Sequence, residues 1–215
     1  MQEKQSQSVS KATIDRLPLY LRFLQEASAR GDKYISSSVI AQSISVSSVL
    51  VRKDLALVSS KAGVPRKGFA VATLINDIEK FLGYDNLSDV IVVGAGGLGK
   101  AFLGYEGFKN NGMNIVAAFD KDPTLVGTFV SGKPILPMDK LPAFVEERKI
   151  RIGIIAVPKG AAQEVLDKMA GAGIKAIWNF APAALQTPKG VTLKTEDLAA
   201  SLSILASKLF RLAAD

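Results

Sequence analysis

Cysteine and histidine are both absent from this chain of 215 residues. Without cysteine, the chain can form no disulfide framework, no thiolate nucleophile and no cysteine-ligated zinc or iron–sulfur site. Without histidine, it lacks the usual metal ligand and the usual general base of enzymes. The two absences leave few groups for a metal site or for catalysis, and we expect neither.

Long apolar runs are absent as well. The amino-terminal stretch MQEKQSQSVSKAT is polar and does not resemble a signal peptide. No segment approaches the roughly 18–20 uninterrupted apolar residues that a membrane span needs. Hydrophobic residues nevertheless make up 48% of the chain, enough for a buried core throughout. The sequence predicts a soluble cytoplasmic protein with no membrane partner, and its length suits two domains.

Positive charge is concentrated at one end of the chain. The net charge is +7 at neutral pH. Residues 1–70 hold 11 Lys and Arg against 5 Asp and Glu, whereas residues 71–215 hold 16 against 15. A solvated basic face would account for a charge bias alone, but its concentration in one predicted domain favours a polyanionic partner.

Short helices are predicted for the first third of the chain. The first is indicated by apolar residues at helical spacing, namely Ile14, Leu17, Leu21, Leu24 and Ala27. Pro18 suggests that the main helix begins near that residue, because a proline inside a helix removes a backbone hydrogen bond. Gly31 is expected to end the helix.

Two further helices with serine caps follow. Ser36 or Ser37 is expected to cap a helix that runs to about residue 43. After the turn SISVS, Ser47 is expected to cap a third helix that runs to about Val58. Two short helices across a tight turn form a helix-turn-helix.

The third helix has an apolar and a basic side. Its inward stripe consists of Val51, Leu55 and Val58. Val49, Lys53 and Ala56 point the opposite way, with Arg52 on the shoulder between the two sides. A narrow basic surface with small apolar groups suits the major groove of DNA, where thymine methyl groups are exposed. The DNA contacts predicted for this helix are Ser47, Ser48, Val49, Arg52 and Lys53.

The segment SSKAGVPRKGFAV comes next and combines a Gly/Pro turn with three cations. A basic hairpin in this place is a wing, which can reach phosphates or the minor groove of DNA. We therefore add Lys61, Arg66 and Lys67 to the predicted DNA contacts. A further amphipathic helix around Leu74 and Ile78 ends at the polar stretch GYDNLSD, where we place a domain boundary.

Strands and helices alternate beyond this boundary. Short β-branched runs at 90–93, 115–119, 152–157 and 176–178 are separated by predicted helices from residue 98 onward, at 141–148 and at 161–169. This alternation predicts parallel strands joined by right-handed crossovers, a Rossmann-type doubly wound sheet.

A glycine motif lies between the first of these strands and its helix. Gly94, Gly96 and Gly99 form G-x-G-x-x-G in the strand–helix context that raises this motif above chance. Gly94 permits the tight turn, Gly96 lets a pyrophosphate approach the backbone, and Gly99 lets the helix pack closely. The predicted cofactor contacts of this loop are Gly94, Ala95, Gly96, Gly97, Leu98 and Gly99.

Asp120 ends the second strand, 21 residues after Gly99. A carboxylate in this place accepts hydrogen bonds from the hydroxyls of the adenosine ribose and repels a 2′-phosphate. NAD(H) is therefore favoured over NADP(H), with Lys121 beside the ribose site. Tyr105 and Lys109 have the Tyr-x-x-x-Lys spacing of short-chain dehydrogenases, but they follow the first glycine loop instead of lying far downstream. We expect no enzymatic activity.

Several stretches, in this order, resemble the Rex family of redox-sensing transcriptional repressors over essentially the whole chain. They are RLPLYLRFL, VRKDL, the glycine loop running into YEGF, FDKDP, AVPKGAAQ, GIKAIWNFAP and TEDLAASL. The resemblance implies a homodimeric winged-helix repressor that reads the NADH/NAD⁺ ratio, with NAD⁺ as the competing ligand. NADH would release it from operator DNA, an inverted repeat, at fermentative and respiratory genes.

The resemblance also implies roles for particular residues. Val157 and Pro158, together with Asn179 and Phe180 of the NFAP stretch, would border the nicotinamide. In a switch trio, Tyr105 and Arg22 would compete for Asp197 of the other subunit. Two features depart from the family: many relatives have asparagine or arginine where Gly97 stands, and the wing KAGVPRKGF differs from the common GKRGVGY.

The carboxyl-terminal segment DLAASLSILASKLFRLAAD is apolar on most of its circumference. Leu198, Leu202, Leu205, Leu209 and Leu212 are joined by Ile204 and Phe210 on other faces. Such a helix needs more burial than one sheet face offers. It could be an ordinary last helix on its own domain, but insertion into a partner subunit, as in the family, explains the excess better.

We therefore predict three parts: a winged-helix DNA-binding domain at 1–84, a Rossmann NAD(H)-binding domain at 85–196 and a domain-swapped dimerisation helix at 197–215. Two other functions stay open at this point. One is an NAD-dependent oxidoreductase with an accessory module. The other is a CoA-binding regulator, although Asp120 disfavours the CoA 3′-phosphate at its position.

Overall fold

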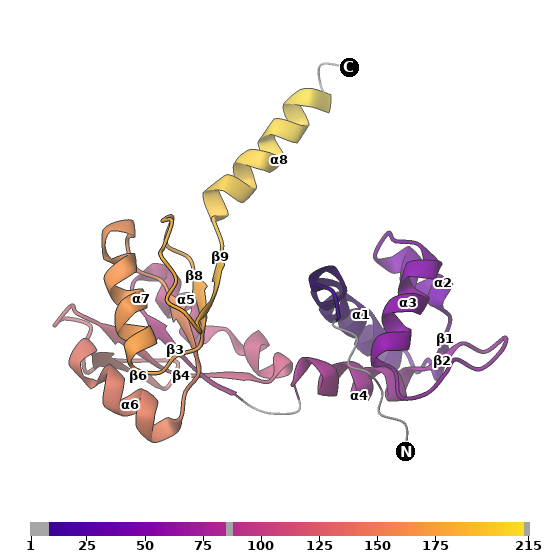
Figure 1. Cartoon of the computed structure of the whole chain (residues 1–215), viewed down its shortest axis with the longest axis horizontal. Helices are drawn as coiled ribbons and strands as arrows, with labels where there is room; N and C mark the ends of the chain where they lie inside the picture. The colour runs from indigo at the N-terminus through magenta and orange to yellow at the C-terminus, as the bar shows by residue number, and fades with distance from the viewer. Residues whose placement is uncertain (1–8, 85–87, 213–215) are drawn as a thin grey trace. The chain divides into compact units, whose positions relative to one another are not determined.

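The computed structural model describes residues 9–84 and 88–212, and the chain divides into two compact units, Met1–Asn86 and Leu87–Asp215 (Figure 1). The domain boundary predicted after residue 84 meets residues 85–87, which lie outside the described residues.

The first unit is a winged helix. Its elements are α1 (Lys11–Ala29), β1 (Tyr34–Ile35), α2 (Ser37–Ser43), α3 (Ser48–Val58), β2 (Phe69–Ala70) and α4 (Val71–Leu82). Both predicted serine caps are confirmed. Ser36 accepts a hydrogen bond from the Val39 amide, and Ser47 accepts one from the Leu50 amide at 3.2 Å. The antiparallel pair β1–β2 closes the base of the wing.

One apolar core holds this unit together. All three long helices contribute side chains that are less than 2% exposed: Leu17 and Leu24 of α1, Val51 and Leu55 of α3, and Leu74 and Ile78 of α4. The predicted inward stripe of α3 is therefore confirmed at Val51 and Leu55. Val58 is partly buried against the same cluster.

The predicted start of the first helix is wrong. Helix α1 begins at Lys11, capped by Ser10, and continues through Pro18. An interior proline costs about 3 kcal/mol in a free helix. In this unit the residues on both sides of it are anchored, because Leu17 and Leu21 are buried in the core. Tertiary packing thus outweighs the proline.

The second unit is a doubly wound sheet, as predicted. Its strands are β3 (Ser88–Val93), β4 (Met113–Asp120), β5 (Phe129–Val130), β6 (Lys133–Pro137), β7 (Ile152–Ile155), β8 (Ala176–Asn179) and β9 (Thr192–Thr195). In the described part of the chain they form one sheet in the order β5-β6-β4-β3-β7-β8-β9, with only β5 antiparallel to its neighbour. Numbered along the chain, the parallel strands stand in the order 3-2-1-4-5-6, which is that of dinucleotide-binding Rossmann folds.

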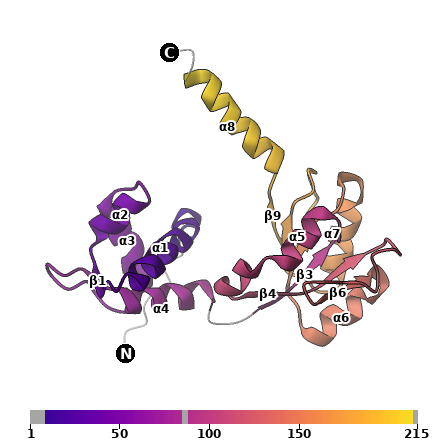
Figure 2. The same cartoon turned by 180° about the vertical axis from the view of Figure 1, so that it is seen from behind.

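Helices cover the two faces of this sheet (Figures 1 and 2). They are α5 (Gly97–Gly104), α6 (Leu141–Arg148) and α7 (Ala162–Gly171), with short 3₁₀ turns η1 (Glu106–Asn111), η2 (Met138–Lys140) and η3 (Lys159–Ala161). Alternation along β3 divides the core, because successive side chains of a strand point to opposite faces. Ile91 and Val93 pack with α6 and α7, whereas Val90 and Val92 pack with Leu103 of α5.

Three strands of this sheet were not predicted. Strand β6 carries prolines at two of its five positions, and a proline in a run argues against a strand. Strand β9, TLKT, lies at the sheet edge and is mostly exposed, so it lacks an apolar run. Strand β5 has only two residues. Sheet pairing, which the local sequence does not reveal, places all three.

Helix α8 (Leu198–Leu212) ends the described chain. Its apolar side chains are exposed by 60% or more, namely Leu198, Leu202, Ile204, Leu205, Leu209 and Phe210. The side chain of Leu212 lies outside the described residues. At roughly 1.5–3 kcal/mol for each fully buried leucine or phenylalanine, leaving this surface in water would be costly.

Candidate functional site

The glycine loop joins β3 to α5. Gly94 has a φ of +100°, and a Cβ there would collide with the Ala156 carbonyl of the neighbouring strand end. A Cβ at Gly99 would overlap the Gly94 carbonyl. The two positions therefore admit only glycine, one for the turn and one for the close packing of helix on strand.

The middle of the loop is open. A Cβ built at Gly96 or Gly97 would have no atom within 4 Å. Helix α5 begins there with no side chain capping its first amides. Unpaired amides at a helix start, with the positive end of the helix dipole, attract phosphate groups.

Asp120, at the end of β4, is fixed against this loop. Its Oδ2 accepts a hydrogen bond from the Ala95 amide at 2.6 Å, and its Oδ1 accepts one from the Asp122 amide at 2.9 Å. A carboxylate has about four acceptor positions. Two therefore remain for the adjacent hydroxyls of a ribose.

A cleft of about 910 Å³ lies at the carboxyl ends of β3, β4 and β7. Ligands of open α/β sheets bind at this edge, where the strand order reverses. Of the predicted cofactor residues, the cleft is lined by Gly94, Gly96, Asp120, Lys121, Val157 and Pro158. Its volume falls in the range of about 300–1,000 Å³ for small-molecule sites. The residues present thus fit an adenine dinucleotide.

Other predicted cofactor residues lie elsewhere. Leu98 and Phe180 line a second cavity of about 930 Å³, next to Trp178 and Phe102. Asn179 is fully buried: its amide nitrogen donates to the Ala181 carbonyl, and its oxygen accepts from the Ala181 amide. Asn179 therefore shapes the turn after β8, and the structure does not bring it into the nucleotide cleft.

The predicted switch residues lie in both units. Tyr105 follows α5, is 59% exposed and lines the second cavity with Leu198 at the start of α8. Asp197 caps α8, since its Oδ1 accepts a hydrogen bond from the Ala200 amide at 2.8 Å. Arg22 is exposed on α1 in the first unit. Any switch role for Asp197 thus comes in addition to its capping role.

The DNA face predicted for α3 is open to solvent. Val49, Arg52, Lys53 and Ala56 are all exposed, and Val49 is 51% exposed. Ser47 lies at the cap, with Ser48 half-buried behind it. Val49, Lys53 and Ala56 share the side of the helix opposite Val51 and Leu55, and Arg52 lies at the edge of that side.

The wing is a tight hairpin closed by a bridge between Val64 and Gly68. Its three predicted cations, Lys61, Arg66 and Lys67, are exposed. Arg66 has a φ of +63°, the strained turn position, and the Lys67 ammonium lies 5.8 Å from the centre of the Tyr34 ring. The hairpin therefore presents its charge outward.

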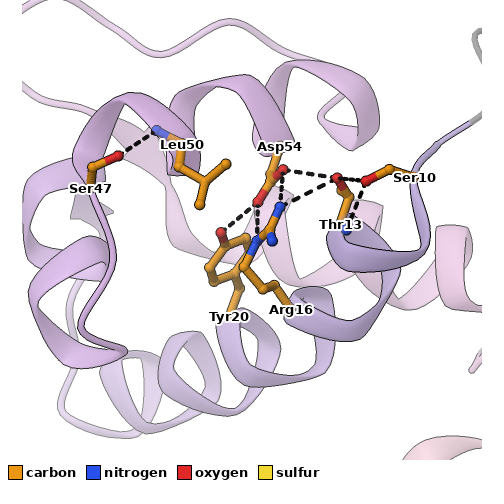
Figure 3. Close-up of polar contacts among 7 residues, drawn as sticks. All are labelled: Ser10, Thr13, Arg16, Tyr20, Ser47, Leu50 and Asp54. Carbon is orange, nitrogen blue, oxygen red and sulfur yellow. Dashed lines mark hydrogen bonds and ion pairs between the residues drawn. The ribbon is translucent and has the colours of Figure 1, made fainter.

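A buried polar cluster beneath α3 was not predicted (Figure 3). Asp54, 2% exposed, accepts hydrogen bonds from Arg16 Nε at 2.8 Å, Arg16 Nη2 at 2.9 Å, Tyr20 Oη at 2.7 Å and Thr13 Oγ1 at 3.1 Å. Burial acts to raise the pKa of Asp54, but these four bonds outweigh it and leave that pKa below 3.8. We call Asp54, Arg16, Tyr20 and Thr13 the Asp54 hub.

The described residues contain neither a metal-binding cluster nor a membrane-spanning helix. No group of three or more acidic side chains there is arranged to hold a metal ion. No helix in residues 9–84 and 88–212 is long and apolar enough to cross a bilayer.

Comparison with known families divides the chain in the same way. Residues 8–56 match the family described as "Putative DNA-binding protein N-terminus", and residues 85–183 match the family described as "CoA binding domain".

Whole-chain relatives agree with both matches. The chain is 42% identical to the redox-sensing transcriptional repressor Rex of Treponema denticola, over 90% of this chain and 91% of the relative. Two crystal structures of the repressor RSP share 35% identity and cover 96% of this chain. One, in complex with β-NAD⁺ and operator DNA, has a TM-score of 0.89 and is covered over 94% of its length. The other, in complex with β-NADH, has a TM-score of 0.85 and is covered over 97% of its length.

A winged helix with a basic face, joined in one chain to a Rossmann unit with a glycine loop, defines a DNA-binding regulator that carries a nucleotide domain. The identity and coverage given above then fix the family. The chain belongs to the Rex family of redox-sensing transcriptional repressors. It is a transcriptional repressor and not a dehydrogenase, although it shares the Rossmann fold with that class.

Proposed function

We propose that this chain is a homodimeric repressor that binds operator DNA and is released by NADH, so that it reads the NADH/NAD⁺ ratio in the cytoplasm, where both ligands occur. One observation carries the proposal. A carboxylate-anchored glycine loop and an exposed basic recognition helix lie in one chain. A relative of 35% identity was crystallised with NAD⁺ and operator DNA, and also with NADH.

The nucleotide would occupy the cleft at the carboxyl ends of β3, β4 and β7. Its pyrophosphate would lie over Gly96 and Gly97 at the start of α5, and its adenosine ribose at Asp120. Val157 and Pro158 would lie on the nicotinamide side. Asn179 would act through the turn that it holds, because its side chain is fully buried.

On DNA, α3 would enter the major groove with Val49, Arg52 and Lys53, while the wing reaches phosphates with Lys61, Arg66 and Lys67. A dimer with twofold symmetry presents two such helices. The operator would therefore be an inverted repeat, with half-sites about 34–36 Å or a multiple of that distance apart.

Dimerisation would use α8 and the second cavity. The cavity is lined mostly by apolar side chains, including Phe102, Phe108 and Trp178, and α8 exposes an apolar surface of its own. A swap would bury both surfaces at once, with α8 of each subunit packed against the other. Asp197, at the start of that helix, would then reach Arg22 and Tyr105 in turn.

A CoA ligand is the second candidate, because residues 85–183 match the family described as "CoA binding domain". Asp120 speaks against it, since a carboxylate beside the ribose repels a 3′-phosphate as well as a 2′-phosphate.

The test is a titration of the full-length protein bound to an operator duplex. NADH, NAD⁺ and CoA are added separately, and the fraction of bound DNA is followed by fluorescence anisotropy. Release at low NADH, with NAD⁺ acting only as a competitor, is the expected result. Release by CoA, with no effect of NADH, would replace the proposal by the second candidate.

A further inference from the structure

The Asp54 hub lies directly under the residues proposed to contact DNA. Asp54 follows Arg52 and Lys53 on the same turn of α3. The side chain of Asp54 is buried, whereas those of Arg52 and Lys53 are exposed. Its partners Thr13, Arg16 and Tyr20 all come from α1, more than thirty residues away in sequence. Figure 3 shows them converging on the one carboxylate.

Stability alone does not account for a buried ion pair in this position. Asp54 is buried and the Arg16 side chain is 20% exposed, so desolvation of the carboxylate and partial desolvation of the guanidinium offset much of their attraction. Replacing such a pair by apolar residues of similar volume is often neutral or stabilising. The apolar core around Val51 and Leu55 is already in place to hold α3 on the unit. The hub therefore needs another explanation.

Direction is what the hub adds. Apolar contacts such as those of Val51 and Leu55 have no preferred orientation, so they tolerate a small rotation or slide of a helix. Hydrogen bonds weaken steeply when they bend, and a bidentate Arg–carboxylate pair fixes both distance and plane. The two bonds from Arg16 and the bond from Tyr20 hold the Asp54 carboxylate from different points of α1.

We propose that Asp54, Arg16 and Tyr20 are positioning residues, which fix the rotation of α3 about its axis and its position relative to α1. In this position Arg52 and Lys53 meet the base edges of the operator. The inference rests on the proposed DNA-binding function. It assigns to the hub a role in discrimination between sequences, since base contacts specify the site whereas phosphate contacts only hold the protein on DNA.

The test replaces three members of the hub by apolar groups of similar volume in the full-length protein, as Arg16→Met, Tyr20→Phe and Asp54→Leu together. Thr13 is kept, since its hydroxyl still has a hydrogen-bond partner in Ser10. Two duplexes are used: the inverted repeat that the unmodified protein selects from a randomised pool, and a random duplex of equal length. We expect a folded protein whose operator affinity falls about tenfold, the size of one lost base contact. Affinity for the random duplex and the salt dependence on it should stay the same.

The controls separate positioning from folding. Tyr84→Phe removes a tyrosine hydroxyl, as Tyr20→Phe does, from a residue that packs against the same core but lies outside the hub. This control should leave the affinities for both duplexes unchanged. If the triple variant does not fold, Tyr20→Phe alone is measured, because it keeps the packing and removes one bond to Asp54. A smaller loss, again confined to the operator, is expected there.

Two outcomes would overturn the proposal: unchanged operator affinity in a folded variant, or equal losses on both duplexes. Failure of the proposed function would look different, because the unmodified protein would then select no operator from the pool.

Discussion

The glycine loop holds the Asp120 side chain in position through a hydrogen bond. Its bond to the Ala95 amide joins the end of β4 to the glycine loop and leaves acceptor positions toward the cleft. Glycine spacing and the distance to this carboxylate are local in sequence, which is why this half of the site could be predicted.

Substitution of Asp120 by alanine should weaken NADH binding and narrow the preference for NADH over NADPH. The ribose loses an ionised acceptor, worth roughly 1.5–3 kcal/mol, and a 2′-phosphate is no longer repelled. Isothermal titration with each nucleotide measures both effects. Asp167→Ala is the control, because that carboxylate bonds to Gln163 on α7 and does not line the cleft. An unmodified protein that binds NADPH as tightly as NADH would refute the role of Asp120.

Tyr20 makes the stability of the first unit depend on pH in the alkaline range. Burial and the hydrogen bond to Asp54 raise its pKa from 10.0 to about 12. The folded state therefore keeps this proton where the unfolded state has lost it. The stability contribution is complete below pH 10 and disappears as the pH rises from 10 to about 12.

The free energy of unfolding should fall over that interval by roughly 2–3 kcal/mol more in the unmodified protein than in Tyr20→Phe. Urea unfolding followed by circular dichroism between pH 9 and pH 12 measures the difference. Parallel curves for the two proteins would show that Tyr20 ionises equally in both states.

The same residues show where prediction from sequence ends. Asp54 stands in the middle of a correctly predicted helix, between two correctly predicted core positions. Its partner Arg16 is 38 residues away, and their pairing depends on how α1 crosses α3. A charged residue next to an apolar stripe was the available signal, but a solvent-exposed shoulder has the same pattern.

At the scale of elements, the recognition helix and the wing should contribute differently to DNA binding. Arg52 and Lys53 are exposed on α3, whereas Lys67 is exposed on the wing hairpin beside Tyr34. Base contacts give sequence discrimination, and phosphate contacts give affinity that falls with salt.

Lys53→Ala or Arg52→Ala should therefore lower operator affinity by about 1–3 kcal/mol with little effect on random DNA. Lys67→Ala should weaken binding to both duplexes alike. It should also reduce the slope of log affinity against log salt concentration by about one. Anisotropy titrations at several salt concentrations give all these values. Equal effects of Lys53→Ala and Lys67→Ala on the two duplexes would remove the assignment of α3 as the recognition helix.

Helix α8 should decide the state of assembly. Leu202, Leu205 and Leu209 follow one another at helical spacing and are each more than 60% exposed. Leu205→Glu would place a charge in the apolar contact, and we expect the dimer to dissociate at micromolar concentration. Sedimentation velocity measures this, with Ser207→Glu as the control on the same helix. A Leu205→Glu dimer as tight as that of the unmodified protein would show that α8 is not the contact.

Sequence predicted these elements unevenly. Helices with caps and apolar stripes were identified because their signals lie within a few residues. Strands β6 and β9 were missed, since one contains prolines and the other lies exposed at the sheet edge. The predicted start of α1 near Pro18 was wrong, because core contacts on both sides of the proline outweigh the hydrogen bond that it removes from the helix.

At the scale of the whole molecule, regulation requires two states of the dimer that NADH and operator stabilise in opposite senses. The penalty that each ligand imposes on the other is then equal, typically about 1–3 kcal/mol. Arg22 lies on the DNA-binding unit, Tyr105 after the glycine loop and Asp197 at the start of α8. An aspartate shared between donors of different units would link the two states.

The capping role of Asp197 has to be separated from this switch role, and asparagine allows it. Asparagine caps helices about as well as aspartate, whereas alanine costs about 1 kcal/mol. Asp197→Asn should keep α8 and the NADH affinity but lose the charge that Arg22 and Tyr105 compete for. The ratio of operator affinities without and with NADH should then fall from roughly 5- to 150-fold toward one.

Arg22→Ala should have the same effect on the ratio while the wing still contacts DNA. The measurement is operator affinity with and without saturating NADH for each variant. If Asp197→Ala lowers the ratio but Asp197→Asn does not, Asp197 acts only by capping α8, and the charge switch lies elsewhere.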